Sequence, residues 1–92
     1  MTAAPDGGWT LRYSTRADRD IARLDPPIRR RILKALGQLV EDPASVGGLR
    51  KVSGRPESRL RVGDWRVILD VAAGRREIYV HRVLPRGRAY RR

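Results

Sequence analysis

The chain has 92 residues, which allows one small domain and leaves no room for a second hydrophobic core. It holds 21 Lys and Arg residues against 10 Asp and Glu, a formal net charge of +11 at pH 7, and every basic residue except Lys34 and Lys51 is arginine. Arginine presents a planar set of donors that fits phosphate. The excess therefore indicates a polyanionic partner, most simply nucleic acid, or an acidic protein.

The composition also excludes several classes of protein. No apolar run approaches the roughly 18 residues that a membrane span needs, and residues 1–9 lack the apolar stretch of a signal peptide. Cysteine is absent and His81 is the only histidine, which excludes disulfide scaffolds, thiol nucleophiles and ordinary zinc sites. We therefore expect a cytoplasmic protein that uses no metal, no other cofactor and no membrane.

The first elements follow from short patterns near the N-terminus. Residues 1–8, rich in glycine, are expected to form a flexible leader, so that residues 9–92 make up the single domain. Residues 9–13 alternate large apolar with polar side chains, which predicts a half-buried strand. A short helix follows, with Ser14 or Thr15 as its N-cap and Asp18 placed as in a capping box. Its apolar stripe is Ala17, Ile21 and Leu24.

A second, longer helix is predicted between two proline breaks. Asp25 caps its start and Pro26 occupies the first helical position, where a missing N–H costs nothing. Asp42 and Pro43 end it. Its apolar face is formed by Ile28, Ile32, Leu33, Leu36, Leu39 and Val40.

From Leu49 onward, short alternating runs separated by glycine predict an antiparallel meander. Its strands are expected at residues 58–62, 65–71 and 77–84, with turns at residues 63–64 and 73–75. The order is β-α-α-β-β-β, an α+β fold in which two N-terminal helices pack on one face of a four-stranded, largely antiparallel, twisted sheet. The other face or its edge is left open for a ligand.

Arginines cluster on the predicted hairpin. Arg59 and Arg61 project to one side of their strand while Leu60 projects to the other, and a two-residue turn sets Arg66 opposite Arg61. Like charges so close are destabilising unless an anion is bound, which indicates a site. Solvated side chains spread over an open face are the alternative. Residues 47–92 hold 13 basic and 4 acidic side chains, so this half is expected to meet the polyanion.

Two further features carry weaker signals. Residues 85–92 hold four arginines and Tyr90, which suits phosphate contacts and base stacking, the alternative being a disordered basic tail. His81 is expected to share a face with Tyr79 and Val83, and a structural role is favoured over proton transfer. Glu57 and Asp64 are candidates to neutralise arginines.

The hairpin sequence Ser58-Arg-Leu-Arg-Val-Gly-Asp-Trp-Arg-Val-Ile68 and the ending Val83-Leu-Pro-Arg-Gly-Arg-Ala-Tyr-Arg-Arg92 resemble the RelE/ParE superfamily of bacterial toxins from type II toxin-antitoxin systems, the ending most closely its RelE branch. The resemblance covers nearly the whole chain from Trp9 and implies the RelE-like, microbial ribonuclease-type fold. It implies a metal-independent, ribosome-dependent endoribonuclease that cleaves mRNA in the A site, leaving a 2′,3′-cyclic phosphate and a 5′-hydroxyl. A cognate antitoxin would neutralise it.

The resemblance also implies roles for particular residues. Arg59 and Arg61 would bind the mRNA backbone, one of them helping to activate the 2′-hydroxyl, and Arg66 would stabilise the charge on the scissile phosphate. Arg86 would act as general acid or charge stabiliser at the leaving 5′-oxygen, and Tyr90 would stack on or orient the nucleotide. The further RNA-binding residues are expected to be Arg50, Lys51, Arg88 and Arg91.

The sequence departs from the family pattern at two positions. Pro85 stands where relatives carry a histidine, and Arg59 stands where relatives carry a lysine, which leaves a poor general base because arginine stays protonated. Electrostatic help alone, or Tyr90 or His81 as a substitute, would then support cleavage. Two other interpretations remain, a ParE-like toxin that inhibits DNA gyrase without nuclease activity and a plain RNA-binding module or decayed toxin.

Overall fold

The structure is a computed structural model that describes residues 8–51 and 57–89. Within these ranges the chain forms five strands and three α-helices, joined by short 3₁₀ turns. In chain order they are β1 (Thr10–Tyr13), α1 (Thr15–Ala22), α2 (Pro26–Glu41), β2 (Leu49–Lys51), β3 (Glu57–Val62), β4 (Trp65–Ala72), β5 (Glu77–Pro85) and α3 (Arg86–Ala89). The predicted order of strands and helices is confirmed, with β2 and α3 as additions.

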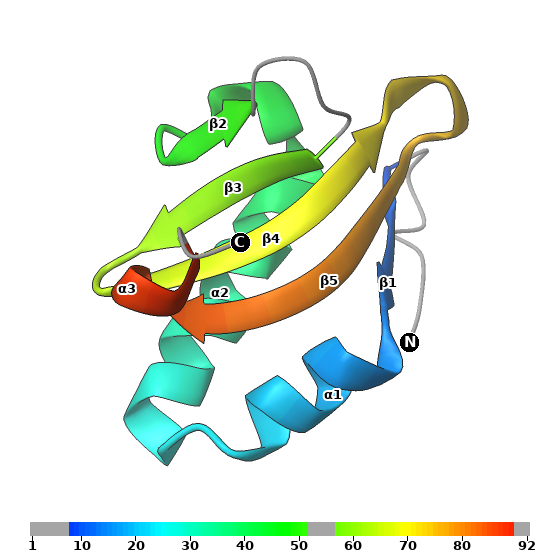
Figure 1. The fold of residues 1–92 in the computed structure, drawn as a ribbon. Helices are drawn as coiled ribbons and strands as arrows, with labels where there is room; N and C mark the ends of the chain where they lie inside the picture. Colours follow the sequence, from blue (N-terminus) through cyan, green and yellow to red (C-terminus); the bar gives the residue numbers. More distant parts are fainter. Residues whose placement is uncertain (1–7, 52–56, 90–92) are drawn as a thin grey trace.

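The strands of the described residues form one sheet in the order β1-β5-β4-β3-β2, in which β1 runs parallel to β5 and the other neighbours are antiparallel (Figure 1). The expected four strands therefore become five. β2 is only three residues long, too short to show an alternating pattern, and the backbone holds it in place. Arg61 N donates to Gly48 O at 3.0 Å, and a Cβ at Gly48 would come within 2.8 Å of Arg61 O, so glycine permits the close approach.

The helices α1 and α2 cover one face of the sheet and enclose the main core, as predicted (Figure 1). Leu33 is the exception on the predicted apolar face of α2, because it lies at the outer margin of the stripe and is 42% exposed. The fully buried side chains that meet between helix and sheet are Ile32, Leu36, Leu39, Leu60, Val67, Leu69, Ile78 and Val80. The opposite face of the sheet is called here the open face, and of the helices in residues 8–51 and 57–89 only α3 lies on it, at its end (Figure 1).

Two side chains of the α1 region form hydrogen bonds that hold it against β5. Ser14 is the N-cap, since its Oγ accepts from Ala17 N at 3.0 Å, and the same Oγ donates to His81 O at 2.7 Å. Asp20 accepts three hydrogen bonds, from Arg82 Nε at 2.8 Å, Arg82 Nη2 at 3.2 Å and Val83 N at 2.8 Å. The helix therefore fixes the middle of β5 as well as packing on it.

β5 contains an irregularity at this point. Leu69 of β4 is paired with Val80 while Ile68 is paired with Arg82, so His81 is an extra residue in β5. The insertion changes which side chains share a face. Val83 turns into the core, where it is 2% exposed, whereas His81 lies with Tyr79 on the open face at a ring-centroid distance of 4.8 Å. The expectation that all three share one face is wrong because it assumed uninterrupted alternation.

The stability of the folded state depends on pH in the alkaline range because of Tyr13 in β1. Burial, and secondarily the charge of Asp18, raises the pKa of the Tyr13 hydroxyl. The neutral phenol therefore stabilises the folded state fully below about pH 10, the pKa of an unfolded tyrosine, and this contribution is lost as the pH rises through the raised pKa. We expect Tyr13→Phe to move the midpoint of alkaline unfolding to higher pH, measured by circular dichroism. A midpoint unchanged from that of the unsubstituted protein would contradict this assignment.

Candidate nucleic-acid interface

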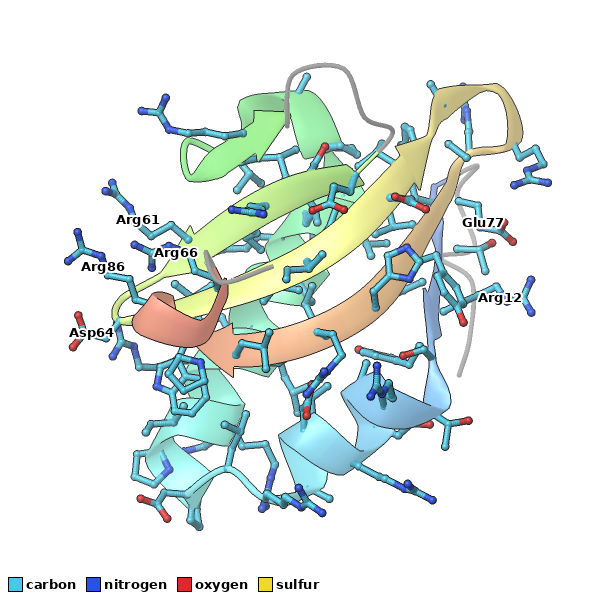
Figure 2. All side chains as sticks on the ribbon, viewed as in Figure 1. Arg12, Arg61, Asp64, Arg66, Glu77 and Arg86 are labelled. Carbon is cyan, nitrogen blue, oxygen red and sulfur yellow. The ribbon has the colours of Figure 1, made fainter. Side chains whose placement is uncertain are left out.

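Three of the predicted site arginines meet at the end of the open face formed by the β3–β4 hairpin. Arg61 of β3 lies directly opposite Arg66 of β4, as predicted, and Arg86 begins α3 where β5 ends. Figure 2 shows Arg61, Arg66 and Arg86 gathered at this end, with Asp64 beside them. We call these three residues the arginine cluster. Its positive charge is concentrated at one corner of the sheet, which suits a phosphate better than a diffuse surface would.

The hairpin turn sets the geometry of the cluster. Gly63 has a φ of +58°, which disfavours any residue with a side chain, and a Cβ there would lie 2.6 Å from Arg31 Nη2. Gly63 O accepts from Arg66 Nη1 at 3.0 Å, and Asp64 O accepts from Arg86 N at 2.8 Å. The same two-residue turn thus holds both Arg66 and the start of α3.

Arg66 is the most buried member of the cluster. It is only 6% exposed, and its Nη1 donates to Trp65 O at 2.9 Å as well as to Gly63 O. Arg61 and Arg86 are exposed. Because the Arg66 side chain is already held by backbone acceptors, little conformational entropy is lost when an anion binds beside it.

The remaining predicted residues are distributed over neighbouring elements. Arg59 lies further along β3, 17% exposed at the side chain, with its Nη2 3.6 Å from Glu57 Oε2, so Glu57 partly neutralises it. Arg50 is exposed on β2 and is paired with Arg59 across the two strands. Lys51 ends β2 and Arg88 lies in α3. Tyr90 and Arg91 lie outside the described residues.

A second polar group on the open face was not anticipated. His81 Nε2 lies 2.9 Å from Asp70 Oδ2, both side chains are more than one third exposed, and Tyr79 packs edge-on against the imidazole. Asp70 shares the open face with Arg66 through the alternation of β4, a signal that the sequence contains. His81 was expected on the face of Tyr79, and its contact with Asp70 depends on how β4 and β5 are aligned, with Asp70 paired to Tyr79.

The His81–Asp70 pair is separate from the arginine cluster. Asp70 follows Arg66 by four residues of β4, which is about 13 Å at the ~3.3 Å rise of a strand residue. Arg66 also points toward the turn, at the end of β4 away from Asp70. The two groups therefore cannot contact the same phosphate.

Near His81, the Arg82 guanidinium has a defined partner. The hydrogen bond from Arg82 to Asp20 raises the pKa of Arg82 above its ordinary value, so this side chain stays charged.

Within residues 8–51 and 57–89, no group of three or more His, Asp or Glu side chains is placed to hold a metal ion. Among the helices that the structure describes, none is both long and apolar enough to cross a membrane.

The fold and the arginine cluster together define a small basic α+β protein with an open sheet face. Over residues 11–90 the sequence matches the family described as the ParE toxin of type II toxin-antitoxin system, parDE. The chain belongs to this family and is thus the toxin of a type II toxin-antitoxin system in the RelE/ParE superfamily. Comparison with curated protein sequences gave no match.

Solved structures of toxin–antitoxin complexes share the fold. The toxin in the RelBE2 complex of Mycobacterium tuberculosis is 26% identical, with 86% of this chain and 99% of that chain covered and a TM-score of 0.71. The archaeal RelE–RelB complex of Pyrococcus horikoshii gives 25% identity, coverage of 87% and 97%, and a TM-score of 0.76. The E. coli RelBE complex, at 22% identity, 84% and 95% coverage and a TM-score of 0.68, supports the fold alone.

Proposed function

We propose that this toxin inhibits translation by cleaving mRNA in the ribosomal A site, as a metal-independent endoribonuclease. The single observation that carries the proposal is the arginine cluster, in which Arg66 is held in place by two backbone carbonyls beside the exposed Arg61 and Arg86. A preorganised group of cations on an open surface is the arrangement that stabilises charge developing on a phosphate.

In the proposed reaction the 2′-oxygen of one ribose attacks the adjacent phosphorus, loses its proton, and displaces the 5′-oxygen of the next nucleotide, which gains a proton. The products are a 2′,3′-cyclic phosphate and a 5′-hydroxyl. Arg66 stabilises the equatorial phosphate oxygens, and Arg86 stabilises the leaving 5′-oxygen. Arg59, Arg61 and Arg50 hold the backbone, together with Lys51, Arg88 and Arg91, while Tyr90 orients the nucleotide.

Proton transfer is the step of this reaction for which the chain has the least suitable side chains. Pro85 replaces the family's histidine, and the arginines stay protonated, so rate enhancement rests on positioning and on electrostatic stabilisation. We therefore propose a modest nuclease whose rate is sensitive to the loss of any one cation of the cluster.

We also propose that a cognate antitoxin neutralises the toxin in the cytoplasm. Two observations support this partner. Toxins of the same fold from M. tuberculosis and P. horikoshii were solved in complex with RelB antitoxins, and the net charge of +11 suits an acidic binding segment.

Inhibition of DNA gyrase is the second candidate function. The family match to ParE toxins favours it, and so does Pro85, which removes a side chain that cleavage would use. In that case the arginine cluster is a protein-binding surface.

One experiment separates the two functions. The chain is expressed from an inducible promoter in a bacterial host, protein and DNA synthesis are followed by pulse-labelling, and abundant mRNAs are analysed by primer extension. Rapid arrest of protein synthesis with cleavages inside coding regions is the result expected for mRNA cleavage. Arrest of DNA synthesis first, with intact mRNA, would assign the toxin to gyrase inhibition instead.

A further inference from the structure

We propose that Asp64 is the general base of the mRNA cleavage proposed above, and that its carboxylate takes the proton of the attacking 2′-hydroxyl. The inference rests on the proposed function and names a proton acceptor that neither Pro85 nor the arginines supply. Asp64 lies in the two-residue turn between β3 and β4, exposed beside the arginine cluster (Figure 2). A general base must stand within hydrogen-bond reach of the hydroxyl that it deprotonates, so the place of this turn decides whether Asp64 qualifies.

The backbone of the turn brings Asp64 close to two arginines of the cluster. Asp64 O accepts from Arg86 N at 2.8 Å, and Gly63 O, one residue earlier, accepts from Arg66 Nη1 at 3.0 Å. The Arg66 guanidinium and the first residue of α3 are therefore both bound to the turn that carries the Asp64 carboxylate. A phosphate held by Arg66 and Arg86 lies next to this turn, which places the preceding ribose within reach of the carboxylate.

The turn itself does not require an aspartate at this position. Its demand for a positive φ falls on Gly63, at +58°, and among the described residues other than glycine only Arg76 has a positive φ. A hairpin turn with glycine at its first position accepts many residues at the second. Turn geometry therefore leaves the acidic side chain unexplained, and substitution of Asp64 is compatible with the fold.

The Asp64 carboxylate has no partner within residues 8–51 and 57–89. Three arginines gather at this end of the sheet, yet the ion pairs of the described chain do not include Asp64. Glu57, the other carboxylate considered as a partner of arginines, is already engaged, with its Oε2 3.6 Å from Arg59 Nη2. The oxygens of Asp64 are thus free to accept a proton from a ligand, which a protonated guanidinium cannot do.

The step needs no reactant besides RNA and water. One oxygen of the Asp64 carboxylate takes the proton of the 2′-hydroxyl while the 2′-oxygen forms its bond to phosphorus. The bond from phosphorus to the 5′-oxygen breaks, and this oxygen keeps the electron pair and takes a proton from water. The Asp64 carboxylic acid then returns its proton to the solvent. Arg66 and Arg86 stabilise the negative charge that develops on the phosphate and on the leaving oxygen.

Partial neutralisation of the cluster is the alternative role for Asp64, and it predicts a change of opposite sign. A carboxylate beside a phosphate repels both the bound RNA and the negative charge of the transition state. If Asp64 only weakened the field of the arginines, its removal would raise the affinity for RNA and the cleavage rate. Removal of a general base lowers the rate, because water then has to accept the proton.

Asp64→Asn tests the two roles on programmed ribosomes. We expect single-turnover cleavage at saturating toxin to fall by about 10²-fold, the lower end of the usual effect of a general base, while ribosome affinity stays equal or rises. Asp25→Asn is the matched control, because Asp25 is an exposed aspartate at the start of α2 whose side chain makes no capping hydrogen bond. Its cleavage is expected to stay within a few-fold of the unsubstituted rate. Cleavage by Asp64→Asn at or above the unsubstituted rate would overturn the proposal.

Added formate separates proton transfer from a structural role. In Asp64→Ala the turn keeps its backbone hydrogen bonds, and a small carboxylate can occupy the space of the missing side chain. We expect sodium formate to raise the cleavage rate of this variant several-fold and saturably, whereas sodium chloride at the same ionic strength does not. Arg66→Ala is not expected to respond, because it lacks a cation and not a base. A loss in folded Asp64→Ala that formate leaves unrestored would also overturn the role as general base.

The unsubstituted toxin distinguishes a failure of this proposal from a failure of the proposed function. If it cleaves mRNA and Asp64→Asn cleaves equally fast, the general base is wrong and the nuclease stands. If the unsubstituted toxin arrests DNA synthesis and cleaves no mRNA, the proposed function fails, and the role given to Asp64 fails with it.

Discussion

Replacing Arg66 by alanine is expected to lower mRNA cleavage on programmed ribosomes by about 10²–10³-fold, the usual effect of removing one preorganised donor from a developing anion. Arg66 is the cation that the hairpin holds most firmly, with Nη1 bonds to Gly63 O and Trp65 O. The loss should fall on the rate of the bound complex more than on the affinity for the ribosome, measured by single-turnover cleavage at saturating toxin.

The matched control is Arg75→Ala. Arg75 carries the same charge in the turn between β4 and β5, is 78% exposed at the side chain, and pairs only loosely with Glu77 at 3.5 Å. Cleavage by this variant is expected to stay within a few-fold of the unsubstituted toxin. Equal losses in both variants would mean that net charge, and not the cluster, supports activity.

Arg66 also stabilises the hairpin through its hydrogen bonds to Gly63 O and Trp65 O. Its effect on the free energy of unfolding must therefore be separated from its effect on the cleavage rate. Thermal unfolding of Arg66→Ala and of Arg66→Lys shows how much stability each substitution removes. Lysine keeps the charge and loses the planar set of donors, and it should remain folded with reduced cleavage. Full cleavage by a folded Arg66→Lys or Arg66→Ala protein would remove Arg66 from the proposed site.

Asp20→Ala is expected to destabilise the toxin by about 2–3 kcal/mol, measured by urea denaturation. The carboxylate of Asp20, 10% exposed at the side chain, accepts from Arg82 Nε, Arg82 Nη2 and Val83 N. Its removal leaves the partly buried guanidinium and one strand N–H without an acceptor, next to the extra residue of β5.

Asp18→Ala in the same helix provides the control. Asp18 is an exposed residue of the first turn of α1, where a carboxylate interacts favourably with the helix dipole, and its loss should cost no more than about 1 kcal/mol. Asp20→Asn keeps one acceptor oxygen and is expected to fall between the two. A loss for Asp20→Ala as small as that for Asp18→Ala would show that α1 is held to β5 by packing alone.

The regular parts of the fold could be predicted from local chemistry. The proline breaks and the wide apolar face defined α2, and the two-residue turn at Gly63 and Asp64 fixed the register that sets Arg61 opposite Arg66. These features depend on neighbours in sequence, so the pattern of side chains is enough to specify them.

The features that escaped prediction depend on contacts between distant segments. β2 exists because its backbone lies against β3, and three residues carry no period of their own. Val83 faces the core because β5 contains one extra residue, which alternation alone cannot show. The His81–Asp70 pair depends on the alignment of two strands, because Asp70 is paired with Tyr79, two residues before His81.

The parallel pairing of β1 with β5 has a consequence for how the toxin is made. Thr10 is paired with Glu77, and Ser14 N donates to Val80 O at 2.9 Å, so the first strand and first helix are secured by the last strand. During synthesis β1 and α1 leave the ribosome well before β5 does, and until then they have no partner in the sheet. Arg86 follows β5 in the chain, so the arginine cluster is also completed only at this stage. The ribosome that synthesises the toxin therefore builds its N-terminal half long before any folded, basic surface exists.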